Sequence, residues 1–477
     1  MDALTSRRSR QGGLVAVLLS MLFLYQADAT IVNVAAPSIR ADLGLDDGQL
    51  ELVVGGYLLA SATCLITAAK LGETTGYRRM FLAGVSVFGL ASLAAGLAPG
   101  AAVLVLARLG QGVGGACAFP QVLSMLQLEF PPGPERARAL GMYSAALAGG
   151  AVAGQVLGGV IVSVGALGWR PAFLLNVPIT VALVLAGRHL LPRYPSASRR
   201  DRLDVPGAVT FSSTVFVVVL PLTLGRGAGW PPWALVFLAL AMPALLLFFH
   251  VERGRATAGR PRLINVQEIR RPAIAWALAA IALAISTYYG LLFTLALYLQ
   301  AGLGRGPLGS ALILVPWVIA FALAGRLMQR VTPQVRRHLP AVGCTLLAVA
   351  YGGTAFVVIA DLPMAALLVS LAVGGLGLGT AFGSILTHLT SSAPEGFAAE
   401  VSGVFTMTLQ IFGAVGVATF GALFSGLAAP LSPASAPGAF GVVTLVFAAV
   451  AVVAAVLTSL ATRSASSPHS PGHSSRS

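Results

Sequence analysis

The sequence has 477 residues, of which 57% are hydrophobic and only 10% are charged, and its mean hydropathy is +0.86. Such a composition lies far outside the range of soluble globular domains and indicates an integral membrane protein. The net charge of +14 does not indicate a nucleic-acid partner, because the basic residues lie in short connections between long apolar runs.

Fourteen apolar segments are long enough to cross a bilayer, whose hydrocarbon core of about 30 Å needs roughly 20 helical residues. We therefore expect an all-α polytopic membrane protein with 14 transmembrane helices. In chain order, the predicted spans 1 to 14 cover residues 13–37, 48–70, 79–99, 101–127, 138–163, 169–192, 207–225, 231–250, 273–299, 308–328, 337–359, 363–388, 399–425 and 438–461.

The distribution of basic residues predicts the orientation of these spans. With the N-terminus inside, the termini and the loops after even-numbered spans hold 25 of the 30 Lys and Arg residues. The opposite side holds Arg40, Arg170, Arg226 and Arg305, and Arg108 lies within a span. Because cytoplasmic loops are enriched in Lys and Arg, we expect a multi-pass protein of the plasma membrane with both termini cytoplasmic.

Spans 1 to 6 resemble spans 9 to 14, as in the internal repeats from which many transporters are built. We expect a six-helix bundle at residues 1–192, two inserted helices with basic cytoplasmic loops at 193–271, a second bundle at 272–461, and a disordered cytoplasmic tail at 462–477. Cleavage after Ala29 would leave five helices facing six, so we expect span 1 to be retained. The matched small residues are Gly112, Gly114 and Ala116 with Gly377, Gly379 and Ala381, and Gly154 and Gly159 with Gly416 and Gly421.

Several motifs, in a fixed order along the chain, resemble those of the fourteen-span drug:proton antiporters of the major facilitator superfamily. The resemblance implies a major facilitator fold with two six-helix bundles and two inserted central helices. It also implies alternating access powered by a proton gradient, with no other cofactor. The motifs are DATIVNVAAP from Asp28, KLGETTGYRR from Lys70, RLGQGVGGA from Arg108, GGAVAGQVLGG from Gly149 and GWRPAFLLNVPI from Gly168.

Asp28 is the only acid deep within a predicted span, and Arg108 lies at a similar depth. At about 1.5 Å per residue, Asp28 lies roughly 13 Å and Arg108 roughly 10 Å from the outer ends of their spans. Intramembrane acids are costly and usually functional, and burial opposed by a nearby cation lets a carboxyl group bind and release a proton. We expect Asp28 to be the protonation site and Arg108 its partner. The alternatives are a structural ion pair for Asp28 and a bond to backbone carbonyls for Arg108.

Polar and aromatic residues of both halves are the candidates for a substrate cavity. Gln111 and Gln155 lie within a few ångströms of the level of Asp28, by the same rise of about 1.5 Å per residue. Packing is an equal alternative for Gln155, and aromatic core packing is the alternative for the residues of the second half. The predicted cavity residues are Tyr25, Gln111, Gln155, Thr287, Tyr288, Tyr289, Trp317 and Gln410.

Two further motifs have both a structural and a functional interpretation. The loop after span 2 resembles a charge latch that holds the inner gate closed, with membrane anchoring as the alternative; its residues are Gly72, Glu73, Gly76, Arg78 and Arg79. In span 5, glycines recur every four residues on one helix face, which favours close helix packing, and a seal against proton leak is the functional hypothesis. These antiporter-motif residues are Gly150, Gly154, Gly158 and Gly159.

The sequence also departs from the antiporter pattern. Glu73 replaces the usual aspartate, Thr74 and Tyr77 replace basic residues, Gln155 stands where proline is usual, and the body of span 13 has no acid, only Gln410. We expect a monomeric, proton-coupled exporter of small amphipathic or hydrophobic compounds, which is no enzyme and has no metal site. An uptake carrier or uniporter of the same fold, for a small organic solute, is the alternative. A scaffold or enzyme is disfavoured because no catalytic constellation and no sizeable soluble domain are present.

Overall fold

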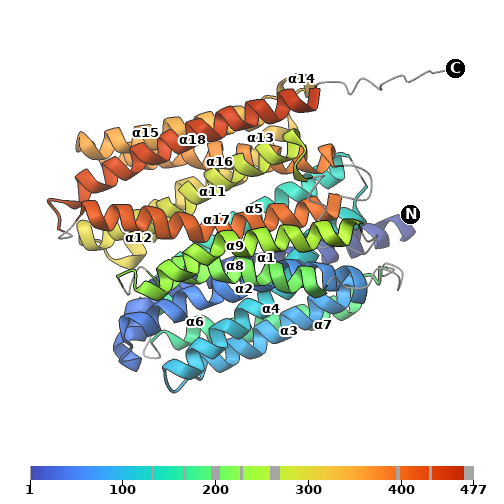
Figure 1. Cartoon of the computed structure of the whole chain (residues 1–477), viewed down its shortest axis with the longest axis horizontal. Coiled ribbons are helices and arrows are strands. Elements are labelled where there is room, and N and C mark those ends of the chain that lie inside the picture. Colours follow the sequence, from blue (N-terminus) through green and yellow to red (C-terminus); the bar gives the residue numbers. More distant parts are fainter. Residues whose placement is uncertain are drawn as a thin grey trace.

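The computed structural model describes residues 2–131, 133–164, 168–194, 205–225, 229–257, 269–393, 398–428 and 432–466. Long helices run side by side along the molecule, and the first and the last helix of the described chain begin and end, respectively, at the same end of it (Figure 1). Within the described residues every regular element is a helix. The expectation of an all-helical protein is therefore confirmed.

The helices of the first half follow the predicted spans 1 to 6. Gly76 makes the tight turn between the second and third helices with φ = 103°, a conformation that favours glycine. Asp46 and Gln49 form a reciprocal capping box at the start of the second helix. The helices are α1 (Asp2–Leu43), α2 (Asp47–Thr75), α3 (Tyr77–Gly96), α4 (Ala101–Glu129), α5 (Pro134–Val164), α6 (Arg170–Leu174) and α7 (Asn176–Leu190).

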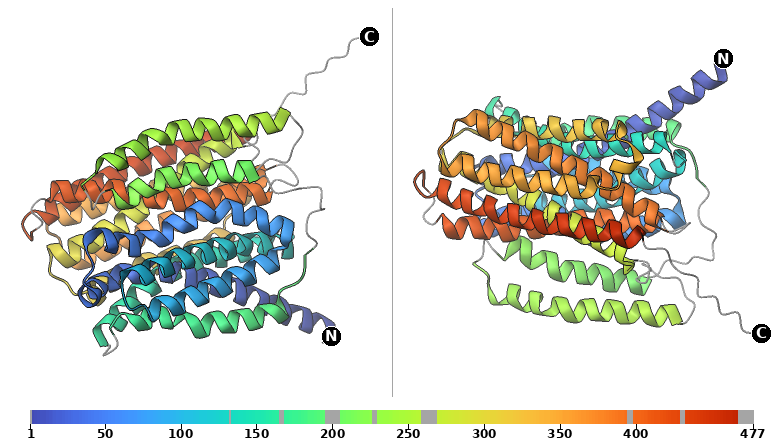
Figure 2. Two further views of the ribbon diagram at one scale, coloured as in Figure 1. Left: turned by 60° about the horizontal axis from the view of Figure 1, so that its bottom comes forward. Right: turned by 90° about the horizontal axis from the view of Figure 1, so that it is seen from above.

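The inserted pair comprises α8 (Val205–Leu224) and α9 (Pro232–Thr257). These two green helices lie on one side of the other helices in the right-hand view (Figure 2), where α8 packs on α9 and α2 and touches α17. The second half contains α11 (Pro272–Leu297), η1 (Tyr298–Gly302), α12 (Pro307–Ile313), α13 (Val315–Gln329), α14 (Pro333–Arg336), α15 (Leu339–Ile359), α16 (Met364–Ser392), α17 (Ala398–Leu427) and α18 (Ala436–Ser466).

Thirteen helices of the described chain are long and apolar enough to cross a membrane. The remaining predicted span, 207–225, is α8, whose described apolar part, Pro206–Pro221, is shorter. Predicted spans 6 and 10 are each divided into two helices, because Pro178 and Pro316 have no amide hydrogen to continue the helix. The predicted tail starts too early, since α18 continues through Ser466, and residues 467–477 lie outside the described part.

The two halves touch at both ends of α5. Near one end, a Cβ atom added to Gly159 would lie 3.2 Å from the Cα of Leu308 in α12. Near the other end, a Cβ atom on Gly325 of α13 would lie 3.8 Å from the Cα of Gly141. Helix α17 also contacts α2 and α4. The two halves are therefore in contact near both ends of α5.

Matching helix crossings reveal the internal repeat in three dimensions. A Cβ atom on Gly84 of α3 would lie 2.7 Å from the carbonyl oxygen of Gly114 in α4. A Cβ atom on Gly343 of α15 would lie 2.8 Å from the carbonyl oxygen of Gly377 in α16. Gly114 thus corresponds to Gly377, whereas the sequence match pairs it with Gly379. The sequence register was wrong by two residues because small residues recur at every second position of both segments, so a shifted alignment matches almost as well.

The crossing between α1 and α5 likewise resembles that between α11 and α17. A Cβ atom on Gly154 would overlap the carbonyl oxygen of Ala27, and one on Gly416 would overlap the carbonyl oxygen of Ser286. In this case the contacts agree with the sequence match of Gly154 with Gly416. Both crossings bring two backbones close together at a glycine, which is how small residues permit tight helix packing in membranes.

Candidate functional site

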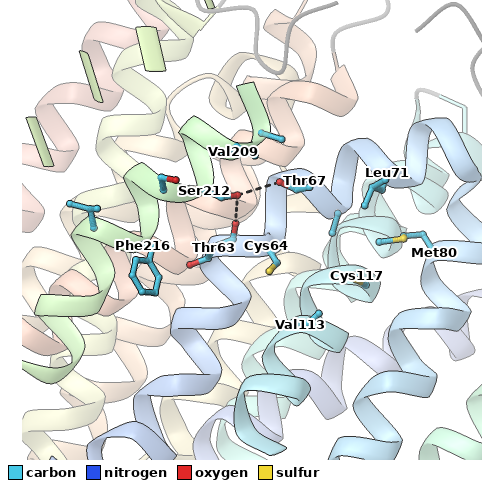
Figure 3. A pocket seen from close by; sticks show the side chains of 14 residues that line it. Thr63, Cys64, Thr67, Leu71, Met80, Val113, Cys117, Val209, Ser212 and Phe216 are labelled. Carbon is cyan, nitrogen blue, oxygen red and sulfur yellow. Dashed lines mark hydrogen bonds between the residues drawn. The ribbon is translucent and has the colours of Figure 1, made fainter. Parts of the chain in front are cut away.

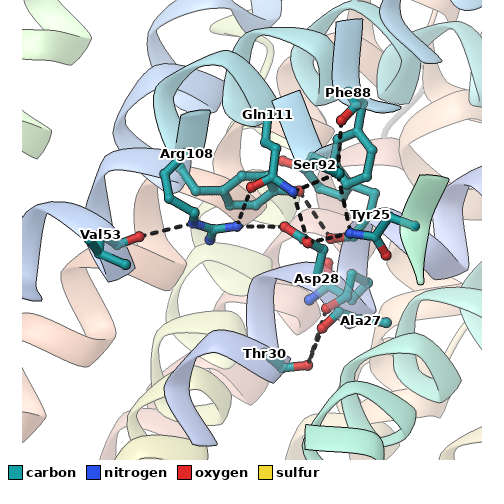
Figure 4. Close-up of polar contacts among 12 residues, drawn as sticks. Tyr25, Ala27, Asp28, Thr30, Val53, Phe88, Ser92, Arg108 and Gln111 are labelled. Carbon is teal, nitrogen blue, oxygen red and sulfur yellow. Dashed lines mark hydrogen bonds and ion pairs between the residues drawn. The ribbon is translucent and has the colours of Figure 1, made fainter. Parts of the chain in front are cut away.

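The candidate site is a buried ion pair in the first half, between α1 and α4 (Figure 4). The Nη1 atom of Arg108 donates a hydrogen bond to Oδ2 of Asp28 at 2.6 Å, and both side chains are 0% exposed. The structure thus brings together the two residues that the depth argument paired. Because burial of charges in a membrane protein is costly, such a pair needs further polar partners to persist.

Two amides complete the surroundings of the Asp28 carboxylate. Nε2 of Gln111 and Nδ2 of Asn176 donate to Oδ1 of Asp28, at 3.0 Å and 2.7 Å. The same two nitrogen atoms also donate to the hydroxyl of Ser92, at 2.8 Å and 3.3 Å. The Ser92 hydroxyl in turn donates to the carbonyl oxygen of Phe88 at 2.8 Å. All of these partners of Asp28 donate, so the site is arranged for an ionised carboxylate.

The sequence left open whether Arg108 pairs with Asp28 or bonds to backbone carbonyl groups, and in the structure it does both. Besides Asp28, its Nε atom donates to the carbonyl oxygen of Val53 at 2.9 Å, and its Nη1 atom to Oε1 of Gln111 at 2.9 Å. Its Cζ atom lies 4.5 Å from the centre of the Tyr57 ring, within cation–π range. Its Nη2 atom is buried and has no hydrogen-bond partner among the described residues. One donor therefore stays available for a second partner.

The packing of α1 on α5 fixes the direction of Asp28. Ala27 and Thr30 face α5, where Gly154 leaves room for their backbone and the Thr30 hydroxyl donates to the carbonyl oxygen of Ala151 at 2.7 Å. Successive helical residues are rotated by about 100°, so Asp28 faces α3, α4 and α7 instead. The glycines of α5 therefore position the acid, although none of them touches it.

A small hollow of about 50 Å³ lies between the two halves. Hydrogen bonds cross between the halves beside it: Nε2 of Gln410 donates to the Tyr25 hydroxyl at 2.7 Å, and Nε2 of Gln26 donates to the Tyr289 hydroxyl at 2.9 Å. Because drug-sized sites occupy about 300–1,000 Å³, this conformation is closed around the central path. The lining residues are Gln26, Phe119, Leu147, Ile285, Tyr288, Tyr289, Phe321, Leu378, Phe382, Leu409 and Gln410.

Three predicted cavity residues line this hollow, namely Tyr288, Tyr289 and Gln410. Tyr25 is buried beside it, and its hydroxyl lies 2.5 Å from the Ser61 hydroxyl. Gln111 is not a cavity residue in this conformation, because its side chain is held in the acid site.

The other three predicted cavity residues also lie outside the lining. The Thr287 hydroxyl accepts a hydrogen bond from the Tyr351 hydroxyl at 3.2 Å, and Trp317 stacks on Tyr288. Gln155 is half-buried on α5 and bonds to neither Asp28 nor a lining residue in the contacts described. The position of a residue along its span gives its depth in the membrane, but it does not give the direction in which the side chain points.

A larger hollow of about 670 Å³ lies between α2, α4 and α8 (Figure 3). The Ser212 hydroxyl donates to the carbonyl oxygen of Thr63 at 2.8 Å and lies 3.3 Å from the Thr67 hydroxyl. Val209 and Phe216 on its rim are exposed on the outside of the bundle. This hollow is therefore open to the surroundings of the protein and is separate from the acid site.

The predicted gating loop makes its described polar contacts within the first half. Glu73 pairs with Lys70 at 3.0 Å, and Nη2 of Arg78 donates to the carbonyl oxygen of Arg188 in α7. Arg79 is exposed. The first contact lies within α2 and the second ties α3 to α7. The role of the loop as a latch against the second half stays a prediction.

Gly72 of this loop leaves room for a buried amide. Nε2 of Gln121 donates to the carbonyl oxygen of Ala68 at 2.9 Å, and a Cβ atom on Gly72 would overlap the same amide group. We expect Gly72→Ala to destabilise the protein by about 1–3 kcal/mol, the usual cost of overpacking, measured as a lower thermal unfolding midpoint in detergent. Adding Gln121→Ala should recover part of that loss, and strictly additive losses would contradict this assignment.

Ser92 and Asn176 are the site residues that sequence reasoning missed. Each lies seven residues from the outer end of its predicted span, roughly 10 Å deep at 1.5 Å per residue. This is the depth of Arg108 and close to that of Asp28. The same arithmetic, applied to every polar residue of the spans and not only to charged residues and glutamines, would have found both.

Comparison with known proteins agrees with this fold. Residues 18–417 match the Major Facilitator Superfamily. The chain is 33% identical to the probable actinorhodin transporter of Streptomyces coelicolor over 437 residues, which covers 90% of this chain and 75% of that protein. It is 34% identical to the cephamycin export protein CmcT of Amycolatopsis lactamdurans over 426 residues, covering 87% and 85%.

A third relative is the multidrug resistance protein Stp of Mycobacterium tuberculosis, which is 31% identical over 417 residues, covering 86% of this chain and 76% of that protein. These matches extend over most of both chains, and the family consists of transporters and not of enzymes. The chain therefore belongs to the major facilitator superfamily, as a multi-pass membrane transporter of small molecules related to drug and antibiotic export proteins.

Proposed function

We propose that this transporter exports small amphipathic or hydrophobic compounds, such as antibiotics, in exchange for protons. It would act as a monomer with both termini in the cytoplasm, and Asp28 would be the protonation site. The observation that carries the proposal is the ion pair of Asp28 and Arg108, whose side chains are both 0% exposed. The names of the related exporters support the substrate class.

Protonation of Asp28 changes what its neighbours require. A neutral carboxyl group accepts the bonds of Arg108, Gln111 and Asn176 less strongly than a carboxylate. The Arg108 guanidinium is then held mainly by the carbonyl oxygen of Val53 and the face of the Tyr57 ring, and its unpaired Nη2 donor can take a new acceptor. Binding of one proton therefore favours a different arrangement of α1 and α4, and release of that proton to the other side restores the first.

Helix α1 links this change to the contact between the halves. Tyr25 and Gln26 lie two to three residues before Asp28 and bond to Gln410 and Tyr289 of the second half. A shift or rotation of α1 on protonation would move these two bonds together with the acid. This coupling fits alternating access, in which one half rocks against the other around a central site. The gating loop around Glu73 would hold one closed state, and the glycine face of α5 would limit proton leak.

An uptake carrier or uniporter of the same fold is the second candidate. It is favoured by Gln155 in place of the usual proline and by the absence of an acid from the body of predicted span 13. The two functions differ in how transport depends on the proton gradient. An antiporter in everted vesicles accumulates its substrate when the lumen is acidic, because protons leaving the lumen drive compound inward.

The deciding experiment is therefore transport into everted vesicles, tested on a panel of amphipathic antibiotics. We expect accumulation with an acidic lumen, and its collapse when a protonophore removes the gradient. Equilibration that ignores the sign of the gradient would establish the uniporter and overturn the exchange with protons. Accumulation only when the lumen is alkaline would establish proton-coupled uptake.

Asn176 should tune the pH dependence of this exchange. Asn176→Leu removes a donor to the ionised carboxylate, and hydrogen bonds to charged groups contribute about 1.5–3 kcal/mol. Loss of that donor favours the protonated form, so the pH of half-maximal transport should rise by about one to two units, at roughly 1.4 kcal/mol per unit. The measurement is the pH profile of exchange in proteoliposomes.

Thr180→Val is the matched control for this substitution, since the Thr180 hydroxyl lies one turn further along α7 and donates to the backbone of its own helix. Its pH profile should match that of the wild type. An unchanged profile for Asn176→Leu would show that this amide does not act on the protonation step.

A further inference from the structure

The helix crossings identify the counterpart of the acid site in the second half. Asp28 follows Ala27, and Thr287 follows Ser286, at equivalent crossings with α5 and α17. By the same repeat, Gln111 lies three residues before Gly114, and Gly374 lies three before Gly377. The equivalent pairs are Asp28 with Thr287, Gln111 with Gly374, Arg108 with Leu371, Ser92 with Tyr351, and Tyr57 with Trp317.

This counterpart contains no charged residue, and an indole ring fills it. A Cβ atom on Gly374 would lie 2.9 Å from Cη2 of Trp317, so the indole occupies the space that the Gln111 side chain takes in the first half. The Tyr351 hydroxyl donates to the Thr287 hydroxyl at 3.2 Å, whereas in the other half Ser92 and Asp28 both accept from the Gln111 amide. The two equivalent sites therefore share the same helix arrangement but differ in chemistry: the site in the first half is ionic, and the site in the second half is aromatic.

Three rings of this counterpart form a stack that reaches the central hollow. Trp317 lies 5.7 Å from Tyr288 with an interplanar angle of 20°, and 6.2 Å from Tyr351 with an angle of 26°. Tyr288 lines the hollow between the halves. The stack thus leads from the central path into the second half.

Trp317 carries a donor that nothing in the described chain satisfies. Its side chain is 1% exposed, and its Nε1 atom is buried with no hydrogen-bond partner among the described residues. A buried donor without an acceptor costs free energy, and the counterpart site in the first half has nearly all of its donors satisfied. An acceptor brought by a ligand would remove this cost.

We propose that the cluster of Tyr288, Trp317 and Tyr351 binds the substrate, and that it selects planar aromatic compounds that carry a carbonyl oxygen. The Tyr288 ring moves towards the hollow, the aromatic plane of the substrate stacks on Trp317, and its carbonyl oxygen accepts a hydrogen bond from Nε1. This inference rests on the proposed export function and assigns substrate recognition to the second half, while Asp28 carries the proton in the first.

The test uses two probes of one shape, anthraquinone with two carbonyl oxygens and anthracene with none. Binding to the purified full-length transporter in nanodiscs is measured by competition against a fluorescent aromatic tracer. We expect the wild type to prefer anthraquinone. Trp317→Phe keeps a ring but removes the donor, so it should weaken anthraquinone binding by about three- to tenfold and leave anthracene binding unchanged.

Two further variants keep the test decisive if Trp317→Phe folds poorly. Tyr288→Leu should weaken both probes, because it removes the stacking ring that borders the hollow. Trp276→Phe is the matched control for Trp317→Phe. This indole is 40% exposed near the start of α11, the helix that carries Tyr288, and its replacement should change neither affinity. Equal affinity of the wild type for both probes, or an equal loss of both on Trp317→Phe, would overturn the proposal.

This binding test needs no proton gradient, so it can fail independently of the export proposal. If the probe pattern holds while Asp28→Asn still drives exchange, the aromatic site stands and the proton site is wrong. If the probe pattern is absent while exchange depends on Asp28, the export function stands and the aromatic site is wrong.

Discussion

Asp28→Asn should abolish proton-driven transport, whereas Asp42→Asn should leave it near the wild-type rate. Both aspartates lie on α1 and pair with an arginine: Asp28 with Arg108 at 2.6 Å and Asp42 with Arg170 at 2.7 Å. The first pair is 0% exposed, and the second lies at a helix end with the Asp42 side chain 45% exposed. Surface pairs contribute little to stability.

The physical reason is that an asparagine side chain cannot bind and release a proton in the pH range in which transport occurs. Asp28→Asn also leaves Arg108 as a buried charge without a counter-ion, and breaking a buried pair costs about 3–5 kcal/mol, so folding must be checked by size-exclusion elution and helical circular dichroism. The measurement is compound accumulation and proton flux in proteoliposomes. Gradient-driven accumulation by a well-folded Asp28→Asn protein would contradict the assignment.

Gly154→Leu should disrupt the protein far more than Gly149→Leu. At Gly154, even the first side-chain carbon would overlap the backbone carbonyl of Ala27 and the Thr30 hydroxyl, so α1 and α5 must separate. At Gly149, a Cβ atom meets only the edge of the Phe23 ring at 3.7 Å, an ordinary contact with a partly exposed side chain.

We expect Gly154→Leu to lower the thermal unfolding midpoint strongly. Overpacking against side chains that can move usually costs about 1–3 kcal/mol of stability, and here a backbone must move, so the loss should be larger. It should also raise passive proton leak, because the separated helices no longer hold Asp28 in place. Thermal unfolding in detergent and dye-reported leak in liposomes measure the two effects. Similar midpoints and full coupled transport for both variants would count against the role of this crossing.

Much of the fold follows directly from sequence periodicity and apolar length. The long apolar runs determined where helices form, because a membrane helix must satisfy its backbone groups internally over about 20 residues. The pair of Asp28 and Arg108 was also predictable, since charges are so rare in these spans that two at one depth have few other partners. Pro178 and Pro316 accompany the divided spans, but proline alone would not have predicted them, because Pro120, Pro221 and Pro243 lie inside continuous helices.

Other features depend on how helices far apart in the chain are rotated against each other. Asn176 reaches Asp28 from 148 residues away, and Gln26 reaches Tyr289 from 263 residues away. Depth along a helix does not fix which face a side chain lies on, so Gln111 was expected in the cavity and is found in the acid site. The repeat register failed for a related reason, because contacts between backbones, and not residue identity, define which glycines are equivalent.

The most direct test of the central claim is infrared difference spectroscopy of the purified transporter in nanodiscs as the pH is lowered. If Asp28 is the residue that binds the proton, a carboxyl C=O band of a buried group appears on acidification in the wild type and in Asp42→Asn, and is missing in Asp28→Asn. A band that persists unchanged in Asp28→Asn would place the proton on another group and contradict the account.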